Sequence, residues 1–322
     1  MEEEAPPSPP SPPSPPCYRP VSPLSISQLV RLYCRERLLV RPTHWTDRHL
    51  ELLGCSFGKP SQAPATAPSV LFGKLGSGLL RRAFGYSEWR LLPRENALDG
   101  LLTMDGPCDK RPNLRFTFNR RPVQTLRCTV FFPKIQRAPD VLPSIVAARV
   151  DIARISEFRD DLFMLPEKWE GYRSARSLSI LQKKKITPKN RLHDPYLLGT
   201  LISIAQENKA RAAVRKELPE PRFLSQLLVS SDNEKELYLY KAYIPSSLLC
   251  SLDDPASIPL EPASIPVDIT AIRYSPYRSF RDRLTTLVLP EDDLARLRAA
   301  QGKDGLLCQS TQPDAEQATA CS

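Results

Sequence analysis

His193-Asp-Pro-Tyr-Leu-Leu-Gly-Thr-Leu-Ile-Ser-Ile-Ala-Gln206 is the stretch that decides the fold. Asp194 is a favourable helix N-cap, and Pro195 suits the first helical position because its missing N–H would be unpaired there anyway. Apolar residues then recur at helical spacing, at Leu198, Leu201, Ile202, Ala205, Ala212 and Ala213. The sequence therefore predicts a central amphipathic helix, which Pro219 and Pro221 end.

The segments on either side of this helix have the two-residue period of strands. One predicted hairpin pairs Leu114–Phe118 with Thr125–Phe132, and a second pairs Phe223–Ser230 with Lys235–Ile244. In the last of these strands, Leu237 and Leu239 alternate with Tyr238 and Tyr240, which suggests one buried face and one aromatic face. Further strands are expected at Val146–Ile155, where a helix stays open, and at Val267–Tyr274.

Helices are expected at both ends of the chain. Ser25 begins an apolar stripe that runs to Leu39, Thr43 caps a second helix that ends at Gly54, and Pro290–Ala300 forms a short helix with an acidic start. Helices and hairpins without regular βαβ spacing indicate an α+β fold. We expect a single domain over residues 25–300, with a weak subdivision near 60–70 left open.

Two tails are expected to be disordered: the Pro/Ser-rich residues 1–24 and the polar residues 301–322. Proline repeats in the first tail could dock an SH3- or WW-type domain or accept proline-directed phosphorylation, and a purely solubilising tail is the alternative. The candidate phosphorylation sites are Ser8, Ser11, Ser14 and Ser22.

The chain is basic, with a formal net charge of +9. Arg173–Lys216 holds eleven Lys and Arg residues against two carboxylates, Asp194 and Glu207. Such a field attracts polyanions. The candidate polyanion-binding residues are Lys183, Lys184, Lys185, Lys189, Arg191, Lys209, Arg211, Arg215 and Lys216. A solvated charged loop remains the alternative for Lys183–Lys185.

Signals for catalysis are weak. A metal-dependent nuclease of the restriction-enzyme type would use Asp140, after Pro139, together with Asp151 on a later strand. Position 153 is Ala, so the lysine that would steady the nucleophile is missing. His44, His49 and His193 do not have metal-ligand spacing, and we expect no metal, no cofactor and, on balance, no enzyme.

The eight cysteines lack any C-x-x-C spacing, and no apolar run approaches the roughly 18–20 residues of a membrane span. The N-terminus shows no apolar signal segment. We therefore expect an intracellular protein of the nucleus or cytoplasm that is not secreted and has no membrane partner.

Two segments carry a resemblance. Asp194–Gln206 and Leu237-Tyr-Leu-Tyr-Lys-Ala-Tyr-Ile-Pro245, followed by Leu248-Leu249 and Leu252-Asp-Asp-Pro255, resemble a family of uncharacterised filamentous-fungal proteins. The resemblance covers about a fifth of the chain. It implies a shared fold unit and origin, and no activity to transfer.

The leading expectation is a non-enzymatic protein that binds an acidic partner, either nucleic acid or an acidic protein surface, through residues 183–216. The alternative is an enzyme, either the divergent nuclease or an accessory enzyme of a fungal small-molecule pathway.

Overall fold

The computed structural model describes residues 24–65, 71–72, 78, 80–81, 91–104, 106–134, 142–166, 171–231, 235–259 and 264–307. The phosphorylation candidates Ser8, Ser11, Ser14 and Ser22 lie outside these residues, as do Asp140 and positions 308–322 of the expected C-terminal tail. Within the described part, the fold is α+β, as the sequence predicts.

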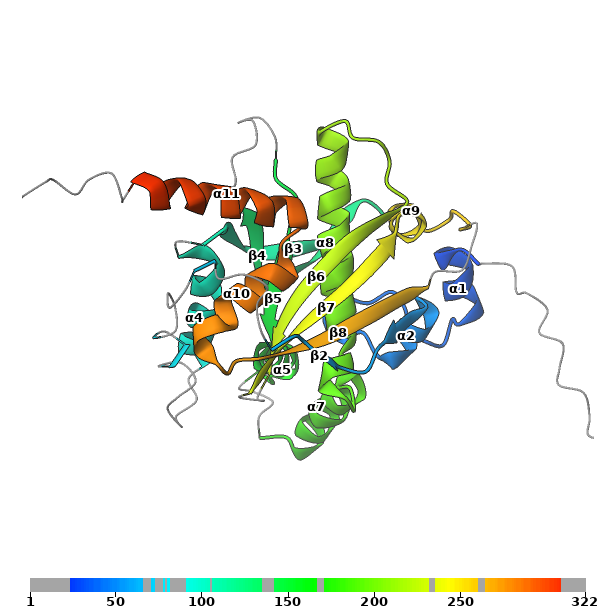
Figure 1. Cartoon of the computed structure of the whole chain (residues 1–322). Helices are drawn as coiled ribbons and strands as arrows, with labels where there is room; N and C mark the ends of the chain where they lie inside the picture. Colours follow the sequence, from blue (N-terminus) through cyan, green and yellow to red (C-terminus); the bar gives the residue numbers. More distant parts are fainter. Residues whose placement is uncertain are drawn as a thin grey trace, which may run out of the picture.

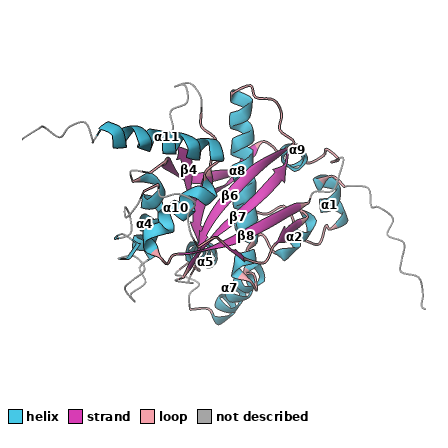
Figure 2. Cartoon of the chain, in the orientation of Figure 1, coloured by secondary structure: helices cyan, strands magenta, loops and turns pink. Residues whose placement is uncertain are grey.

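A mixed sheet of eight strands forms the centre of the described structure (Figure 2). Its strands are β1 (Cys55–Phe57), β2 (Ser61–Gln62), β3 (Cys108–Phe118), β4 (Arg121–Pro133), β5 (Ala147–Asp151), β6 (Arg222–Ser230), β7 (Glu236–Pro245) and β8 (Ile265–Arg273). They are ordered β1-β8-β7-β6-β5-β4-β3, and β2 also pairs with β8. The pairs β5/β6, β1/β8 and β2/β8 are parallel, and the others are antiparallel.

Both predicted hairpins are confirmed. β3 and β4 pair antiparallel and turn at Asn119 and Arg120, whose φ angles of 51° and 59° are left-handed. Positive φ at both central residues suits the right-handed twist of the flanking strands. β6 and β7 pair from Arg222 with Pro245 to Ser230 with Leu237.

Helices cover both faces of the sheet (Figure 1). They are α1 (Ile26–Leu32), α2 (Asp47–Leu52), α4 (Leu91–Thr103), α5 (Ile152–Phe163), α7 (Arg173–Ile186), α8 (Pro195–Val214), α9 (Ser246–Asp253), α10 (Tyr277–Val288) and α11 (Glu291–Leu307), with short 3-10 turns η1 (Pro42–His44) and η2 (Arg191–His193). α4, α10 and α11 lie in front of the sheet, and α8 lies behind it. Each side has its own apolar core.

The central helix begins where the sequence predicts. The Asp194 carboxylate accepts a hydrogen bond from the Tyr196 N–H at 2.9 Å, and Pro195 occupies the first turn. The same carboxylate binds both Nη atoms of buried Arg159, at 2.6 and 2.7 Å. Tyr196–Ala205 are buried without interruption, so the first half of α8 is enclosed on all sides and only the second half is amphipathic.

Tyr238 and Tyr240 of β7 are also buried, because the sheet is covered on both faces. Tyr240 packs in the core on the α8 side, and Leu237 and Leu239 pack in the core beneath α10. The predicted alternation is therefore correct in period, while neither of its faces meets solvent.

Several element boundaries differ from those expected. α1 ends at Leu32, and α2 is capped by Thr46 instead of Thr43. β5 stops at Asp151, whose side chain caps α5, so the expected strand to Ile155 becomes a strand followed by a helix. α11 extends to Leu307, past the predicted start of the C-terminal tail.

Candidate functional site

The predicted basic residues fall into two groups at opposite ends of α8 (Figure 1). Lys183–Lys185 lie on α7, Lys189 lies in the connector that follows, and Arg191 lies on η2, all before the first turn of α8. Lys209, Arg211, Arg215 and Lys216 lie in its last turns or just beyond. Because α8 has 20 residues, about 30 Å separates its ends. The two groups are separate surfaces.

The group at the end of α8 is largely neutralised by carboxylates. Lys209 Nζ lies 2.9 Å from Asp253, Arg211 Nη2 2.6 Å from Glu207, and Arg215 Nε 2.6 Å from Glu217. Burial lowers the pKa of Lys209, but the hydrogen bond and the negative charge of Asp253, with a smaller contribution from Cys250, together outweigh burial and raise that pKa. The side chains of Lys209, Arg211 and Arg215 are therefore engaged in ion pairs within the fold and are less available to a partner.

The group on α7 keeps most of its charge. Lys183 pairs with Asp160 of α5. Its neighbours are exposed and make no ion pair with any described residue: Arg173, Arg176, Lys184, Lys185 and Lys189. The sequence from Arg173 to His193 contains no carboxylate at all. The last-turn lysines also complement the negative end of the helix dipole.

α7 also exposes apolar side chains. Leu178 is 56% exposed and Leu181 63% exposed, while Ile186 is buried. Leu178, Leu181 and Lys185 have the i, i+3, i+7 spacing of one helix face. We call Arg173, Arg176, Leu178, Leu181, Lys184, Lys185 and Lys189 the α7 surface. The charged-loop alternative is replaced by a helix that combines cations with leucines.

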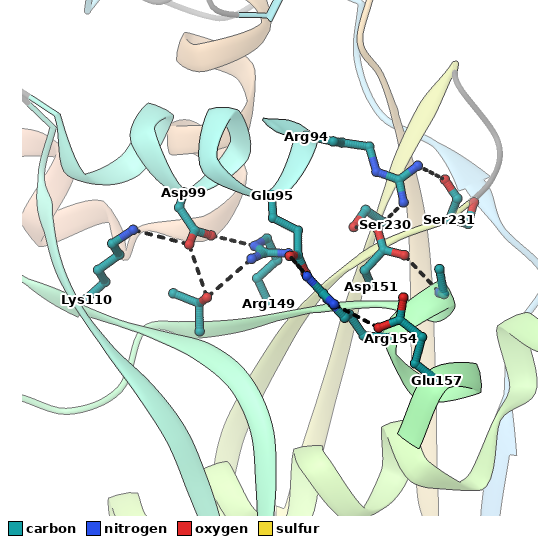
Figure 3. Close-up of polar contacts among 12 residues, drawn as sticks. Arg94, Glu95, Asp99, Lys110, Arg149, Asp151, Arg154, Glu157, Ser230 and Ser231 are labelled. Atoms are coloured by element: carbon teal, nitrogen blue, oxygen red, sulfur yellow. Dashed lines mark hydrogen bonds and ion pairs between the residues drawn. The ribbon is translucent and has the colours of Figure 1, made fainter. Parts of the chain in front are cut away.

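The second candidate site surrounds Asp151, which is fully buried (Figure 3). Its carboxylate accepts hydrogen bonds from Ser230 Oγ at 2.6 Å and from the Ala153 N–H at 2.8 Å, and it pairs with Arg94. Arg94 in turn donates to the Ser231 carbonyl at 3.0 Å. Asp151 therefore anchors α4 and α5 to the ends of β5 and β6.

The neighbouring carboxylates of α4 are engaged in the same way. Arg149 Nε lies 2.5 Å from Asp99, Arg154 Nη2 lies 3.0 Å from Glu95, and Lys110 also reaches Asp99 at 3.3 Å (Figure 3). Glu95, Asp99, Arg149 and Arg154 line an open polar cavity of about 590 Å³. Alternating charges of this kind hold α4 against the sheet.

No group of three or more potential metal ligands occurs among the described residues. Asp140 lies outside them, so its proximity to Asp151 stays a prediction. Each oxygen of Asp151 already accepts a protein hydrogen bond, and Arg94 supplies the positive charge that a metal would otherwise bring.

His49 and His193 both stack on aromatic rings within the fold. The His193 ring stacks on Phe57 with the ring centroids 5.3 Å apart. His49 lies parallel to Trp45, and its Nδ1 accepts the Thr46 N–H at 3.0 Å to complete the cap of α2.

Sequence reasoning missed the arginines at the start of α7 and its leucines. The sequence does show the i, i+3 spacing of Leu178 and Leu181. Such spacing usually marks a buried helix face, whereas both of these side chains are exposed in the structure. Sequence reasoning also missed Glu95 and Asp99, which are one helical turn apart on α4.

Comparison with protein-family models gives no match, and comparison with curated proteins gives none either. The resemblance to fungal proteins therefore stays an expectation. Among the helices that the structure describes, none has the length and apolar character needed to cross a bilayer.

Proposed function

We propose that this protein binds an acidic protein partner through the α7 surface. The observation that carries the proposal is the set of exposed cations on α7 that have no carboxylate partner among the described residues. Unpaired surface cations attract an acidic partner at long range and set the orientation in which it docks. At the far end of α8, Lys209, Arg211 and Arg215 lack this property because carboxylates already pair with them, and only Lys216 is exposed without an ion pair to a described residue.

The exposed leucines favour a protein over a nucleic acid. Single-stranded nucleic acids are held by aromatic stacking and phosphate contacts, whereas the exposed apolar side chains within α7 are aliphatic. Leu178 and Leu181 with Lys185 provide apolar anchors and a charge on one face, which suits a partner with an apolar groove rimmed by carboxylates.

The distribution of apolar residues also argues against a lipid surface as the partner. A helix that lies in a membrane interface needs its apolar side chains gathered on one side. On α7, Ile180 is 58% exposed and lies about 200° around the axis from Leu178. Cations stand between them, so no wide apolar face forms.

A binding series tests this proposal on the full chain. Polyglutamate, a random copolymer of glutamate and tyrosine, duplex DNA and anionic vesicles are compared at low salt and at about 0.15 M salt, where the Debye length is about 8 Å. We expect the copolymer to bind tightest and its affinity to fall with salt. Equal binding to all four probes, preference for DNA or vesicles, or no binding overturns the proposal.

Two variants separate charge from apolar contact. Lys184→Gln/Lys185→Gln should weaken binding to both acidic polymers by roughly 2- to 30-fold, since exposed charge pairs contribute about 0.2–1 kcal/mol each. Leu178→Ser/Leu181→Ser should abolish only the preference for the copolymer. Arg115→Gln/Arg121→Gln removes the same charge from exposed positions of the β3–β4 hairpin and is the matched control.

We also propose an intracellular location, in the nucleus or cytoplasm. Cys34, Cys55, Cys108, Cys128 and Cys250 are free thiols, which a reducing compartment would maintain. Burial raises the pKa of Cys55, Cys108 and Cys128 to about 12, so these thiols stay protonated and inert. Fractionation of cells that express the tagged chain tests the location, and recovery from the medium would contradict it.

A further inference from the structure

A third site lies between the N-terminal helices and the hairpin end of β3 and β4. A cavity of about 560 Å³ opens there beside α1 and α2. Its walls are mainly aliphatic and aromatic, with Leu29, Val30, Leu38, Trp45 and Phe116 among them. The volume and the apolar lining match those of small-molecule sites in proteins, which usually combine an apolar body with a few polar groups.

His49 also belongs to the cavity wall, although its ring Nε2 is buried. His49 is only 7% exposed, and its Nδ1 accepts the Thr46 N–H, which leaves the proton of the neutral ring on Nε2. Burial lowers the pKa of His49, and the nearby backbone of Leu38, Thr46 and Arg37 offsets this only in part, so the ring is neutral at pH 7. Nε2 is buried and makes no hydrogen bond.

The mouth of the cavity is cationic. Arg37 and Arg41 line it, are exposed, and make no ion pair with a described residue. Glu36, the carboxylate next to Arg37, is held by Arg48 at 3.0 Å. Burial lowers the pKa of His44 at the same mouth, and the positive charge of Arg41 lowers it further. Positive charge at the entrance and apolar walls inside are complementary to an amphipathic anion.

We propose that this cavity binds an amphipathic carboxylate, a molecule with one carboxylate and an aliphatic or aromatic body. The carboxylate lies at the mouth against Arg37 and Arg41, and the body contacts the apolar walls. The site is independent of the α7 surface, since the two share no residue. Ligand binding here therefore neither requires nor excludes an acidic partner on α7.

The test uses dodecanoate as the probe on the full chain, with dodecan-1-ol as its uncharged counterpart. Displacement of a fluorescent anilinonaphthalene sulfonate and isothermal titration measure affinity and stoichiometry. We expect one dodecanoate per chain, bound at least about fivefold tighter than dodecanol. Arg37→Gln/Arg41→Gln should abolish that difference and leave dodecanol binding unchanged. Arg31→Gln/Arg35→Gln removes the same charge from exposed positions that do not line the cavity and should change nothing.

Val30→Trp fills the cavity from α1 and should remove binding of both probes while the unfolding temperature stays close to that of the wild type. Any of four results overturns the proposal. Dodecanoate does not bind saturably, or several dodecanoates bind per chain. Alternatively, its preference over dodecanol is unchanged in Arg37→Gln/Arg41→Gln, or its affinity is unchanged in Val30→Trp. If dodecanoate binds only after deletion of residues 1–23, the chain itself covers the cavity and the proposal also fails.

Discussion

Replacing Asp151 with asparagine should destabilise the protein strongly, because Asp151 neutralises a buried arginine. The side chains of Asp151 and Arg94 are 0% and 3% exposed. Removing one partner of a buried ion pair costs about 3–5 kcal/mol, since the remaining charge stays buried without compensation. Asparagine keeps an oxygen for the Ala153 N–H, so the cap of α5 survives. Asp151→Ala loses the cap as well and should cost about 1 kcal/mol more.

Urea unfolding of the full chain, followed by circular dichroism, measures these losses. Asp160→Asn is the matched control. Asp160 lies on α5 and pairs with Lys183, but its side chain is 57% exposed. It should cost less than about 1 kcal/mol. Arg94→Met in the Asp151→Asn background should recover part of the loss, because it removes the unpaired charge. Asp151→Asn within about 1 kcal/mol of the wild type would refute the structural role and return Asp151 to the list of catalytic candidates.

Three further predictions concern the packing and titration of the fold. Gly199→Ala should destabilise by about 1–3 kcal/mol in urea unfolding although alanine favours helices, since its Cβ would lie 2.8 Å from Pro42 Cβ; a gain in stability would contradict the packing. Asp194→Asn should keep the α8 cap but leave Arg159 unpaired, at a cost of about 3–5 kcal/mol, and a loss near zero would show that the pair is dispensable. Burial lowers the pKa of His44 and His49, so below about pH 6.5 the unfolded chain binds protons more readily and stability should fall between pH 7.5 and 5.5. The variant His44→Gln/His49→Gln should flatten that slope, and an unchanged slope would exclude these rings as its source.

The parts of the fold that the sequence predicts are those with local causes. Asp194 and Pro195 mark the start of α8 because a cap and its helix are adjacent in the chain. Both hairpins follow from the two-residue period and the turn between their strands. Thr46 was missed as the cap of α2 because its partner in the capping box is His49, where Glu or Gln is usual.

Long-range features could not be predicted in this way. Cys55 pairs in register with Ile265, a contact across most of the chain that no local pattern encodes. The covering of both sheet faces, which buries Tyr238 and Tyr240, also depends on where α8 and α10 pack.

The candidate site was predicted in part. Counting charges located the lysines of α7, and the i, i+4 pair of Glu207 with Arg211 is visible in the sequence. The pairing of Lys209 with Asp253 is not, because it joins α8 to α9. The division of one basic stretch into a paired and an unpaired surface is thus a property of the fold.

Hydrogen–deuterium exchange with and without the glutamate–tyrosine copolymer tests the central claim most directly. The account predicts slower exchange over residues 173–189 on binding, no change over residues 209–216, and loss of the effect in Lys184→Gln/Lys185→Gln. Protection centred on residues 209–216, or none anywhere despite binding, would contradict it.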